Sequence, residues 1–362
     1  MLAFDIRGLF GAKGQVLGLD IGSRAIKLVQ LKEVKGRYVL EKFGLKPLEP
    51  EVIVDGTVMD ENRVVAAIKE LLSDTGAKLK NVAISISGHS VIVKKISLPP
   101  MPEDELEGQV KLAAEQYIPF DINEVNFDFH ILNPMDQADD GEPQMTLLLV
   151  AAKKDKVNEL TELVKGAGLN PVVMDVDAFA IENMYGINYE DSPDEITALV
   201  NMGASVMNVN ILKGGTSVFT RDIPIGGNRY TEAIQRELGM SHDEAEAAKK
   251  GKHHAVTGSG SVSSVIDGVN AEVASEIART VDYFRTTGSE GEIGKILLCG
   301  GACKVEGFGQ LLSDRMHCPV EFANPFNQVD TSSADVDPET LSEFAAEAAV
   351  GVGLALRAVG DR

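Results

Sequence analysis

Residues 17–31, LGLDIGSRAIKLVQL, combine residue types that can bind a phosphate and a metal ion. Asp20 is a carboxylate at the end of an apolar stretch, and a buried carboxylate needs a partner such as a cation or a bound water. The tight turn from Gly22 to Ala25 would direct successive backbone N–H groups toward one anion. Lys27 follows and could add a positive charge for the same anion. An ordinary hairpin with a solvated aspartate has the same short motif, so the motif alone is weak evidence.

The same pattern occurs a second time in residues 198–212, ALVNMGASVMNVNIL. Asn201 corresponds to Asp20 and Gly203 to Gly22, and each pair is separated by 181 positions. This separation is half of the 362-residue chain, so we expect two related halves that each begin with the same hairpin. Two such turns facing each other across a cleft would bind a nucleotide from both sides.

A third glycine-rich segment joins a strand predicted at residues 295–299 to a following helix. Its small residues are Gly300, Gly301 and Ala302. Small residues between a strand and a helix let the backbone approach a flat ligand or a phosphate closely. Gly226 and Gly227 precede another predicted helix at residues 230–238, and they are weaker candidates for the same role.

Strands and helices are expected to alternate around these motifs, which is typical of an α/β protein. One helix should begin after Asp60 as its N-cap and end at Gly76. Other helices are predicted at residues 103–117, 156–165, 230–238, 271–287 and 343–358, and residues 172–186 predict a strand that leads into a helix capped by Asp177. Further strands are predicted at residues 38–46, 81–87, 90–98, 125–132, 145–152, 216–223 and 295–299, and residues 249–268 predict a loop.

Residues 89–168 predict a small unit of two α/β pieces inserted into the first half. Two of its strands flank the acidic segment 133–143, NPMDQADDGEP, which is predicted to be a mobile loop. Inserted modules on a rigid scaffold commonly carry partner sites.

Composition limits the possible partners and compartments. The net charge of −21 disfavours binding to nucleic acid or to anionic lipid by bulk attraction. No stretch approaches the roughly 18–20 apolar residues of a membrane span, and the charged N-terminal segment is not typical of a signal peptide. Its apolar residues would pack, fray or touch a membrane surface. Three cysteines fit a reducing cytosol, and burial explains Cys299 better than a zinc site with Cys303, His317 and Cys318.

The three glycine-rich segments resemble, in order, the phosphate 1, phosphate 2 and adenosine motifs of the actin-like ATPase superfamily. This resemblance covers essentially the whole chain and implies a bilobed α/β fold of duplicated RNase H-like domains. The insertion resembles subdomain 1C of FtsA-type proteins. Within this group the chain resembles the PilM family of type IV pilus assembly, on DIGSRAIKLVQL, SLPPMPEDELEGQVKLAAEQYIPFDINEVNFDF, VVMDVDAFAIEN and NMGASVMNVNILKGGTSVFTRDIPIGGNRYTEAIQ. The implied division is subdomain 1A at residues 1–88, 169–197 and 340–362, 1C at 89–168, 2A at 198–227 and 290–339, and 2B at 228–289.

The resemblance also implies ATP and Mg²⁺ in the cleft between the lobes. Asp20 and Asn201 would lie at the metal. The residues around the nucleotide would be Gly22, Ser23, Lys27, Gly203, Ala204, Gly226, Gly227, Gly300, Gly301 and Ala302. The family usually has aspartate at the position of Asn201, so we expect ATP hydrolysis to be slow or absent.

PilM-like proteins bind a short N-terminal peptide of the inner-membrane protein PilN in a groove of 1A and 1C, and couple it to cytoplasmic motor ATPases. The resemblance therefore places this chain in the cytoplasm, peripheral at the inner membrane, with membrane contact only through a partner and with no nucleic acid.

Two other functions remain open from the sequence. A small-molecule kinase of the same superfamily would need a general base in the cleft, and Asp175 and Asp177 are the candidates. An FtsA-like polymerising protein would end in a linker and an amphipathic membrane helix, whereas this sequence ends at Arg362 directly after its last predicted helix.

Overall fold

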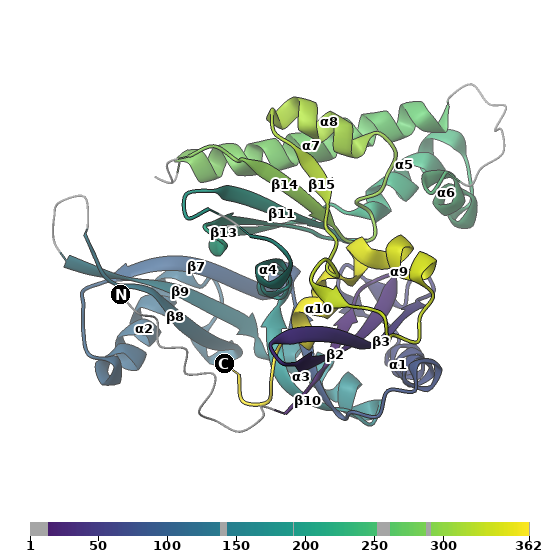
Figure 1. The fold of residues 1–362 in the computed structure, drawn as a ribbon. Helices are drawn as coiled ribbons and strands as arrows, with labels where there is room; N and C mark the ends of the chain where they lie inside the picture. Colours follow the sequence, from purple (N-terminus) through teal and green to yellow (C-terminus); the bar gives the residue numbers. More distant parts are fainter. Residues whose placement is uncertain (1–13, 138–142, 191, 252–260, 287–290, 362) are drawn as a thin grey trace.

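The computed structural model describes residues 14–137, 143–190, 192–251, 261–286 and 291–361. Figure 1 shows two lobes, one built from the purple and blue part of the chain and the other from the green part. Each lobe has a β-sheet with helices packed on it. The apolar N-terminal residues 1–13, for which the sequence left packing and membrane contact open, lie outside the described residues.

The first sheet has the strand order β10-β6-β1-β2-β3-β16. These strands are β10 (Asn170–Val176), β6 (Asn81–Ile86), β1 (Leu17–Ile21), β2 (Ala25–Val34), β3 (Arg37–Pro47) and β16 (Val329–Asp330). The hairpin of β1 and β2 is antiparallel, whereas β1, β6 and β10 run parallel. Helices α1 (Glu61–Thr75) and α3 (Lys154–Gly166) contact this lobe, and α1 begins after Asp60 and ends at Gly76 as the sequence predicts.

The second sheet has the order β13-β12-β11-β14-β15. These strands are β13 (Thr216–Ile223), β12 (Met207–Lys213), β11 (Ile196–Met202), β14 (Lys295–Cys299) and β15 (Val320–Phe322). β11 and β12 form an antiparallel hairpin and β14 runs parallel to β11, so the order repeats β3-β2-β1-β6-β10 of the first sheet. The internal repeat predicted from the sequence is therefore confirmed as a duplicated fold unit.

Helices α4 (Asp177–Asn188) and α10 (Ala349–Ala355) pack between the two sheets. One hydrophobic core joins them to Val29 of the first sheet and to Leu199 of the second. The approach is close because glycine lacks a side chain: a Cβ at Gly353 would lie 1.6 Å from the Ala180 carbonyl oxygen. The small residues of this last helix thus permit its close contact with α4.

The insertion forms its own sheet, β7-β9-β8, covered by α2 (Glu103–Tyr117). Its strands are β7 (Val91–Leu98), β9 (Pro143–Lys153) and β8 (Val125–Gln137). The predicted loop at 133–143 is wrong in its first part, because β8 continues to Gln137 and pairs with β9. Pro134 is tolerated because β8 lies at one edge of the described sheet and its register shifts there.

The second lobe carries α5 (Gly227–Leu238), α6 (His242–Lys249), α7 (Val262–Thr286) and α8 (Phe308–Met316). Helix α6 was not predicted, and α7 begins nine residues earlier than expected. The first part of α7 lies in the stretch 249–268 that its polar and small residues marked as a loop, whereas α6 ends where that stretch begins. Val265, Ile266 and Val269 extend the buried stripe of α7 into the core, and this packing outweighs the low helix propensity of the segment. The predicted last helix is divided into α9 (Pro338–Phe344), a 3₁₀ turn (Ala345–Ala348) and α10.

Candidate functional site

The two hairpin turns have the same hydrogen bond at corresponding positions. The Gly22 N–H donates to the Ala25 carbonyl over 3.1 Å, and the Gly203 N–H donates to the Val206 carbonyl over 3.0 Å. A Cβ at Gly203 would lie 2.7 Å from the Val206 oxygen, so only glycine fits this turn without a shift. Each lobe thus presents one compact turn at the end of its first strand.

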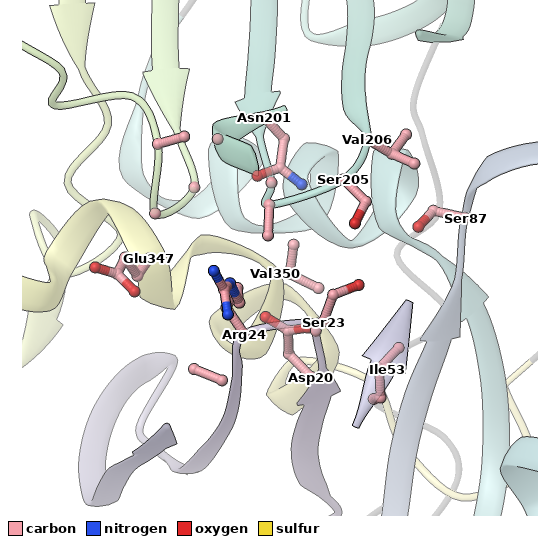
Figure 2. Close-up of a pocket in the computed structure, with 18 of the residues that line it drawn as sticks. Asp20, Ser23, Arg24, Ile53, Ser87, Asn201, Ser205, Val206, Glu347 and Val350 are labelled. Atoms are coloured by element: carbon pink, nitrogen blue, oxygen red, sulfur yellow. The ribbon is translucent and has the colours of Figure 1, made fainter. Parts of the chain in front are cut away.

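Both turns line a single cavity of about 820 Å³, and Figure 2 shows their side chains facing it from opposite lobes. The sequence-predicted residues that line it are Asp20, Gly22, Ser23, Lys27, Asn201, Gly203, Ala204, Gly227, Gly300, Gly301 and Ala302. Gly226 is not among the lining residues. The residues that the sequence grouped by motif therefore meet in one place, although they are separated by up to 282 positions along the chain.

Asp20 has a protein partner in this cavity. Asp20 and Lys27 are cross-strand neighbours in β1 and β2, and the Lys27 Nζ lies 3.1 Å from the Asp20 Oδ2. Burial lowers the pKa of Lys27, but the carboxylates of Asp20 and Glu347 outweigh burial and raise it above its ordinary value. Lys27 therefore remains a cation, and it compensates the buried carboxylate that the sequence expected to meet a cation or water.

Asp177 lines the cavity, as its candidacy for a general base requires, but the N-cap role predicted for it is wrong. It is not an N-cap: α4 begins at Asp177 itself, after Val176, and no side chain caps the helix. The carboxylate instead lines the cavity and accepts hydrogen bonds from Ser85 and Ser87. Burial raises the pKa of Asp177 to about 6, and the neighbouring Asp20 carboxylate adds to the rise.

A signal for Asp177 was present in the sheet order. The parallel strands β1, β6 and β10 end at the same edge of the first sheet, so residues that follow them converge. Asp20 lies one residue before the end of β1, Ser87 follows β6 and Asp177 follows β10. Asp175, the other candidate base, is buried and pairs with Arg357 over 2.8 Å, outside the cavity lining.

The loop after β14 supplies the floor of the cavity on the second lobe. Gly300 has a φ of 86° and donates its N–H to the Ala346 carbonyl over 2.8 Å. The Ala302 N–H donates to the Met202 carbonyl over 3.0 Å. These two bonds fix the loop to both neighbouring elements and leave Gly301 exposed at the cavity.

The start of α5 supports the second turn from behind. The Gly227 N–H donates to the Gly203 carbonyl over 2.9 Å, and the Asn228 N–H donates to the Ala204 carbonyl over 2.8 Å. A Cβ at Gly226 would lie 2.5 Å from the Ala204 oxygen. These amides are therefore used within the protein, and the glycine pair positions the second turn more directly than it would bind a phosphate.

A sequence model of the type IV pilus assembly protein PilM matches residues 18–359. The chain belongs to the PilM family of type IV pilus assembly proteins. A solved PilM-PilN type IV pilus biogenesis complex contains a chain that is 32% identical, with a TM-score of 0.83 over 97% of this chain and 100% of that one. The PilM resemblance seen in the sequence motifs is thus confirmed.

More distant relatives confirm the fold class. The cell division protein FtsA of Escherichia coli (strain K12) is 22% identical over 86% of this chain and 84% of its own length. The structure of MreB5 of Spiroplasma citri bound to ADP has a TM-score of 0.51 and 14% identity, covering 94% of each chain. Like these proteins, the chain has the bilobed actin-like ATPase fold.

Proposed function

We propose that this PilM-family chain binds ATP with Mg²⁺ in the cavity between its lobes and acts as an assembly protein of the type IV pilus platform. The observation that carries the nucleotide proposal is the pair of equivalent turns, Gly22–Ala25 and Gly203–Val206, which line one cavity from opposite lobes. Turns of successive backbone amides suit phosphate oxygens. The ADP-bound MreB5 structure, which shares the fold, supports the same use of the cleft.

The side chains that line the cavity fit Mg²⁺ better than they fit a metal ion whose ligands all come from the protein. In the described part of the chain, no three His, Cys, Asp or Glu residues gather closely enough to hold a metal ion. Mg²⁺ typically keeps several waters and uses one or two carboxylates together with substrate phosphates. Asp20 and Asn201, each one residue before the end of the first strand of its lobe, would hold the ion and its waters, and Lys27 would remain beside Asp20.

The nucleotide would contact the two turns and the loop after β14. The proposed phosphate contacts are Gly22, Ser23 and Lys27 from the first lobe and Gly203 and Ala204 from the second. Gly300, Gly301 and Ala302 would lie under the nucleotide, and Gly226 and Gly227 would support the second turn.

Calorimetry on the full chain tests this proposal. Mg-ATP should bind to the parent protein, and Asp20→Ala should weaken binding by about 10-fold or more when Mg²⁺ is present. In EDTA the difference between the parent and the variant should shrink, because the carboxylate acts through the metal. Equal Mg-ATP affinity of the two proteins would contradict the assignment of Asp20.

We further propose that ATP is hydrolysed slowly or not at all. Asn201 offers one oxygen acceptor and one NH₂ donor group where a carboxylate would offer two oxygen acceptors and a charge. Asn201→Asp should therefore increase Mg²⁺-dependent turnover in single-turnover assays while the melting temperature stays unchanged. Slowly hydrolysed ATP would hold the two lobes together as a structural clamp. Rapid hydrolysis by the parent protein would contradict this role.

One observation favours the kinase alternative enough to test it. Asp177 lies in the cavity with its pKa raised to about 6, which is a suitable range for a general base. A kinase would transfer phosphate from ATP to a small hydroxyl compound in a pooled substrate assay. An assembly protein would release at most inorganic phosphate in the same assay.

The partner proposal rests on family membership and on the solved PilM-PilN complex. The chain would dock an N-terminal peptide of a PilN-type inner-membrane protein in a groove of 1A and 1C and couple it to the pilus motor ATPases. We keep the subdomain division at residues 1–88, 169–197 and 340–362 (1A), 89–168 (1C), 198–227 and 290–339 (2A) and 228–289 (2B). Within 2A, strand β16 pairs with β3 of the first sheet.

A further inference from the structure

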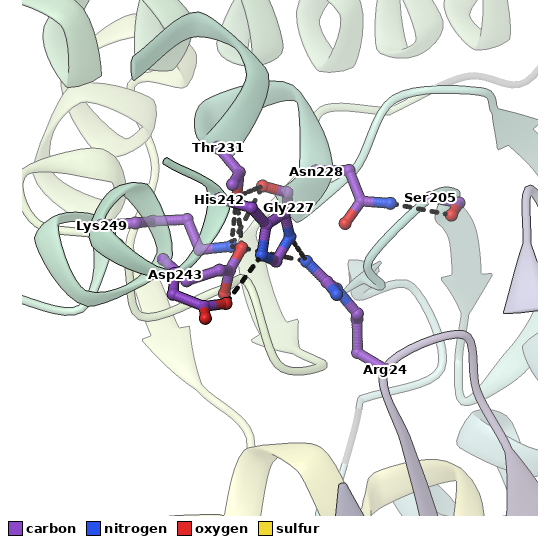
Figure 3. A network of polar contacts seen from close by, with 9 residues as sticks. Arg24, Ser205, Gly227, Asn228, Thr231, His242, Asp243 and Lys249 are labelled. Atoms are coloured by element: carbon purple, nitrogen blue, oxygen red, sulfur yellow. Dashed lines mark hydrogen bonds and ion pairs between the residues drawn. The ribbon is translucent and has the colours of Figure 1, made fainter. Parts of the chain in front are cut away.

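Arg24 connects the two lobes beside the cavity that it and Glu246 both line. It belongs to the turn between β1 and β2, and its guanidinium reaches α6 on the second lobe. There it contacts the His242 Nε2, and its Nη2 lies 3.4 Å from the Glu246 Oε1. Figure 3 shows the Arg24 side chain extended from the first hairpin toward this group.

The receiving group on the second lobe is rigid. The Lys249 Nζ donates to the Glu246 Oε1 over 2.6 Å, to the Thr231 Oγ1 over 3.0 Å and to the Gly227 carbonyl over 3.2 Å. All three ammonium N–H donors are thus used. Thr231 also donates to Glu246, so this carboxylate is held between α5 and α6 before Arg24 reaches it. Arg24 therefore docks on a fixed acceptor and not on a mobile side chain.

The contact with His242 defines one protonation state. Arginine can only donate, so the His242 Nε2 must accept and the proton must be on Nδ1. The His242 Nδ1 lies 3.3 Å from the Asp243 Oδ1, which is a suitable acceptor for that proton. The His242 Nε2 and the Glu246 carboxylate together complement the guanidinium with two acceptors on one face of α6.

We propose that Arg24 is a positioning residue that clasps the lobes together and slows both entry and release of the cavity's ligand. The reason lies in where the contact sits: Arg24 comes from the turn proposed to meet phosphates, while Glu246, Thr231 and Lys249 support the start of α5 behind the second turn. Closing the clasp thus fixes the distance between the two turns. This inference rests on nucleotide binding for its kinetic part and stands alone for its effect on lobe closure.

Lobe closure is measured without nucleotide. Spin labels at Met59→Cys, on the exposed rim of the first lobe, and Glu237→Cys, on exposed α5, report the distance between lobes. The three native cysteines are buried, which favours labelling of the introduced ones. Arg24→Ala should move the distribution toward longer and broader distances. Arg63→Ala, which removes an exposed arginine paired only within the first lobe, is the matched control and should leave it unchanged.

Stopped-flow with a fluorescent ATP analogue measures the kinetic part. Arg24→Ala should raise the association and release rates together by about three- to tenfold, the range for losing a partly exposed charged hydrogen bond, and leave the Kd nearly unchanged. If Arg24 only bound phosphate, its replacement by alanine would raise the release rate and the Kd together. Arg24→Lys should restore part of the slow release, because one ammonium can reach Glu246.

A double-mutant cycle separates the clasp from other roles. His242→Ala and Arg24→Ala should each speed release, and the double variant should be no faster than Arg24→Ala, because both remove the same contact. Additive effects, or a parent-like distance distribution in Arg24→Ala, would overturn the proposal. If the parent protein binds no nucleotide analogue, the nucleotide proposal fails, and the label distances still decide the clasp.

Discussion

At the scale of single residues, the neighbouring glycines of the cavity floor have different roles. Gly300 has a positive φ, and a Cβ there would lie 2.5 Å from both the Asn201 Oδ1 and the Met202 carbonyl oxygen. Gly301 is exposed at the cavity, and a Cβ there would first meet the Glu347 carboxylate at 3.3 Å. The fold therefore requires glycine at position 300. At position 301 the absence of a side chain instead leaves room for a ligand in the cavity.

This difference predicts opposite outcomes for two valine variants. Gly301→Val should fold normally, since the side chain of Glu347 can move, but should lose ATP affinity with and without Mg²⁺ because valine fills the ligand space. Gly300→Val should instead destabilise the protein by about 2–4 kcal/mol, because of backbone strain and overpacking. Thermal melts and calorimetry on both variants distinguish the two effects. Parent-like ATP binding by Gly301→Val would remove Gly301 from the nucleotide site.

Much of the cavity's composition could be predicted from sequence because its signals are local. Asp20, Gly22 and Lys27 lie on one hairpin, so their spacing already places them together. Asp177 and Glu246 reach the cavity only through the order of parallel strands and the packing of α6, which no short motif encodes. The cap assigned to Asp177 is also locally reasonable, and it is wrong because the carboxylate is held by Ser85 and Ser87 of another strand end.

At the scale of elements, α4 forms one of the polar links between the lobes. The Asn210 Nδ2 of β12 donates to the Ala178 carbonyl over 3.0 Å, and the Ser217 N–H of β13 donates to the Glu182 Oε1 over 3.1 Å. Burial raises the pKa of Glu182 to about 7, against the opposing effect of the hydrogen bond from Ser217. An ionisable group therefore sits at the junction that both lobes share.

The raised pKa of Glu182 predicts a dependence of stability on pH. The folded pKa of about 7 lies above the ordinary glutamate pKa of 4.5, so the ionised carboxylate is penalised only in the fold. The contribution of neutral Glu182 is fully present below about pH 4.5 and is lost as pH rises through 7. Glu182→Gln stays neutral, so its stability relative to the parent should increase by about 1–3 kcal/mol between pH 4.5 and 8. Urea titrations across this range measure it.

A matched variant checks that this slope belongs to the buried site. Glu190→Gln changes an exposed glutamate two residues beyond the end of α4 and should show a flat difference from the parent protein over the same range. Equal slopes for the two variants would mean that Glu182 titrates like a surface carboxylate.

The contact of α4 with α10 predicts a second effect at this scale. Gly353→Ala would place a methyl group 1.6 Å from the Ala180 carbonyl oxygen, so the helices must separate at a cost of at least about 2 kcal/mol. Gly186→Ala is the control, because it lies in α4 with nothing within 4 Å of the added Cβ. It should stabilise the protein by about 0.5–1 kcal/mol through helix propensity. Denaturant unfolding of both variants should therefore give changes of opposite sign, and a neutral Gly353→Ala would show that the packing is looser than drawn.

Element prediction from sequence succeeded where capping and periodicity agree, and failed where packing decides. Helix α1 begins after Asp60 and ends at Gly76 as expected, because cap residues act locally. The extension of β8 past residue 132 depends on its partner β9, and the early start of α7 depends on the core of the second lobe. Neither partner is visible in a window of a few residues. The internal repeat gave information that such a window lacks, since the same hairpin pattern in both halves of the sequence predicted two related lobes.

At the scale of the whole molecule, charge decides how the chain can reach a membrane. The net charge is −21, so an anionic lipid surface repels the protein on average. No helix in the described ranges is long and apolar enough to cross a bilayer. Membership of the PilM family and the solved PilM-PilN complex instead support a PilN-type partner, through which we propose that the chain reaches the membrane.

Recruitment by a partner predicts where the full chain is found in cells. It should sediment with inner membranes when a PilN-type partner is present and should appear in the supernatant when that partner is deleted. Purified protein should not pellet with anionic vesicles at physiological ionic strength. The negative charges of the protein and of the lipid repel each other within a screening length of about 8 Å, and this gives no attraction to the vesicle. If the chain remained on membranes without the partner, removal of residues 1–13 would identify the N-terminal apolar residues as the anchor. That result would replace recruitment by a protein with direct lipid binding, whereas release into the supernatant leaves the partner as the sole route to the membrane.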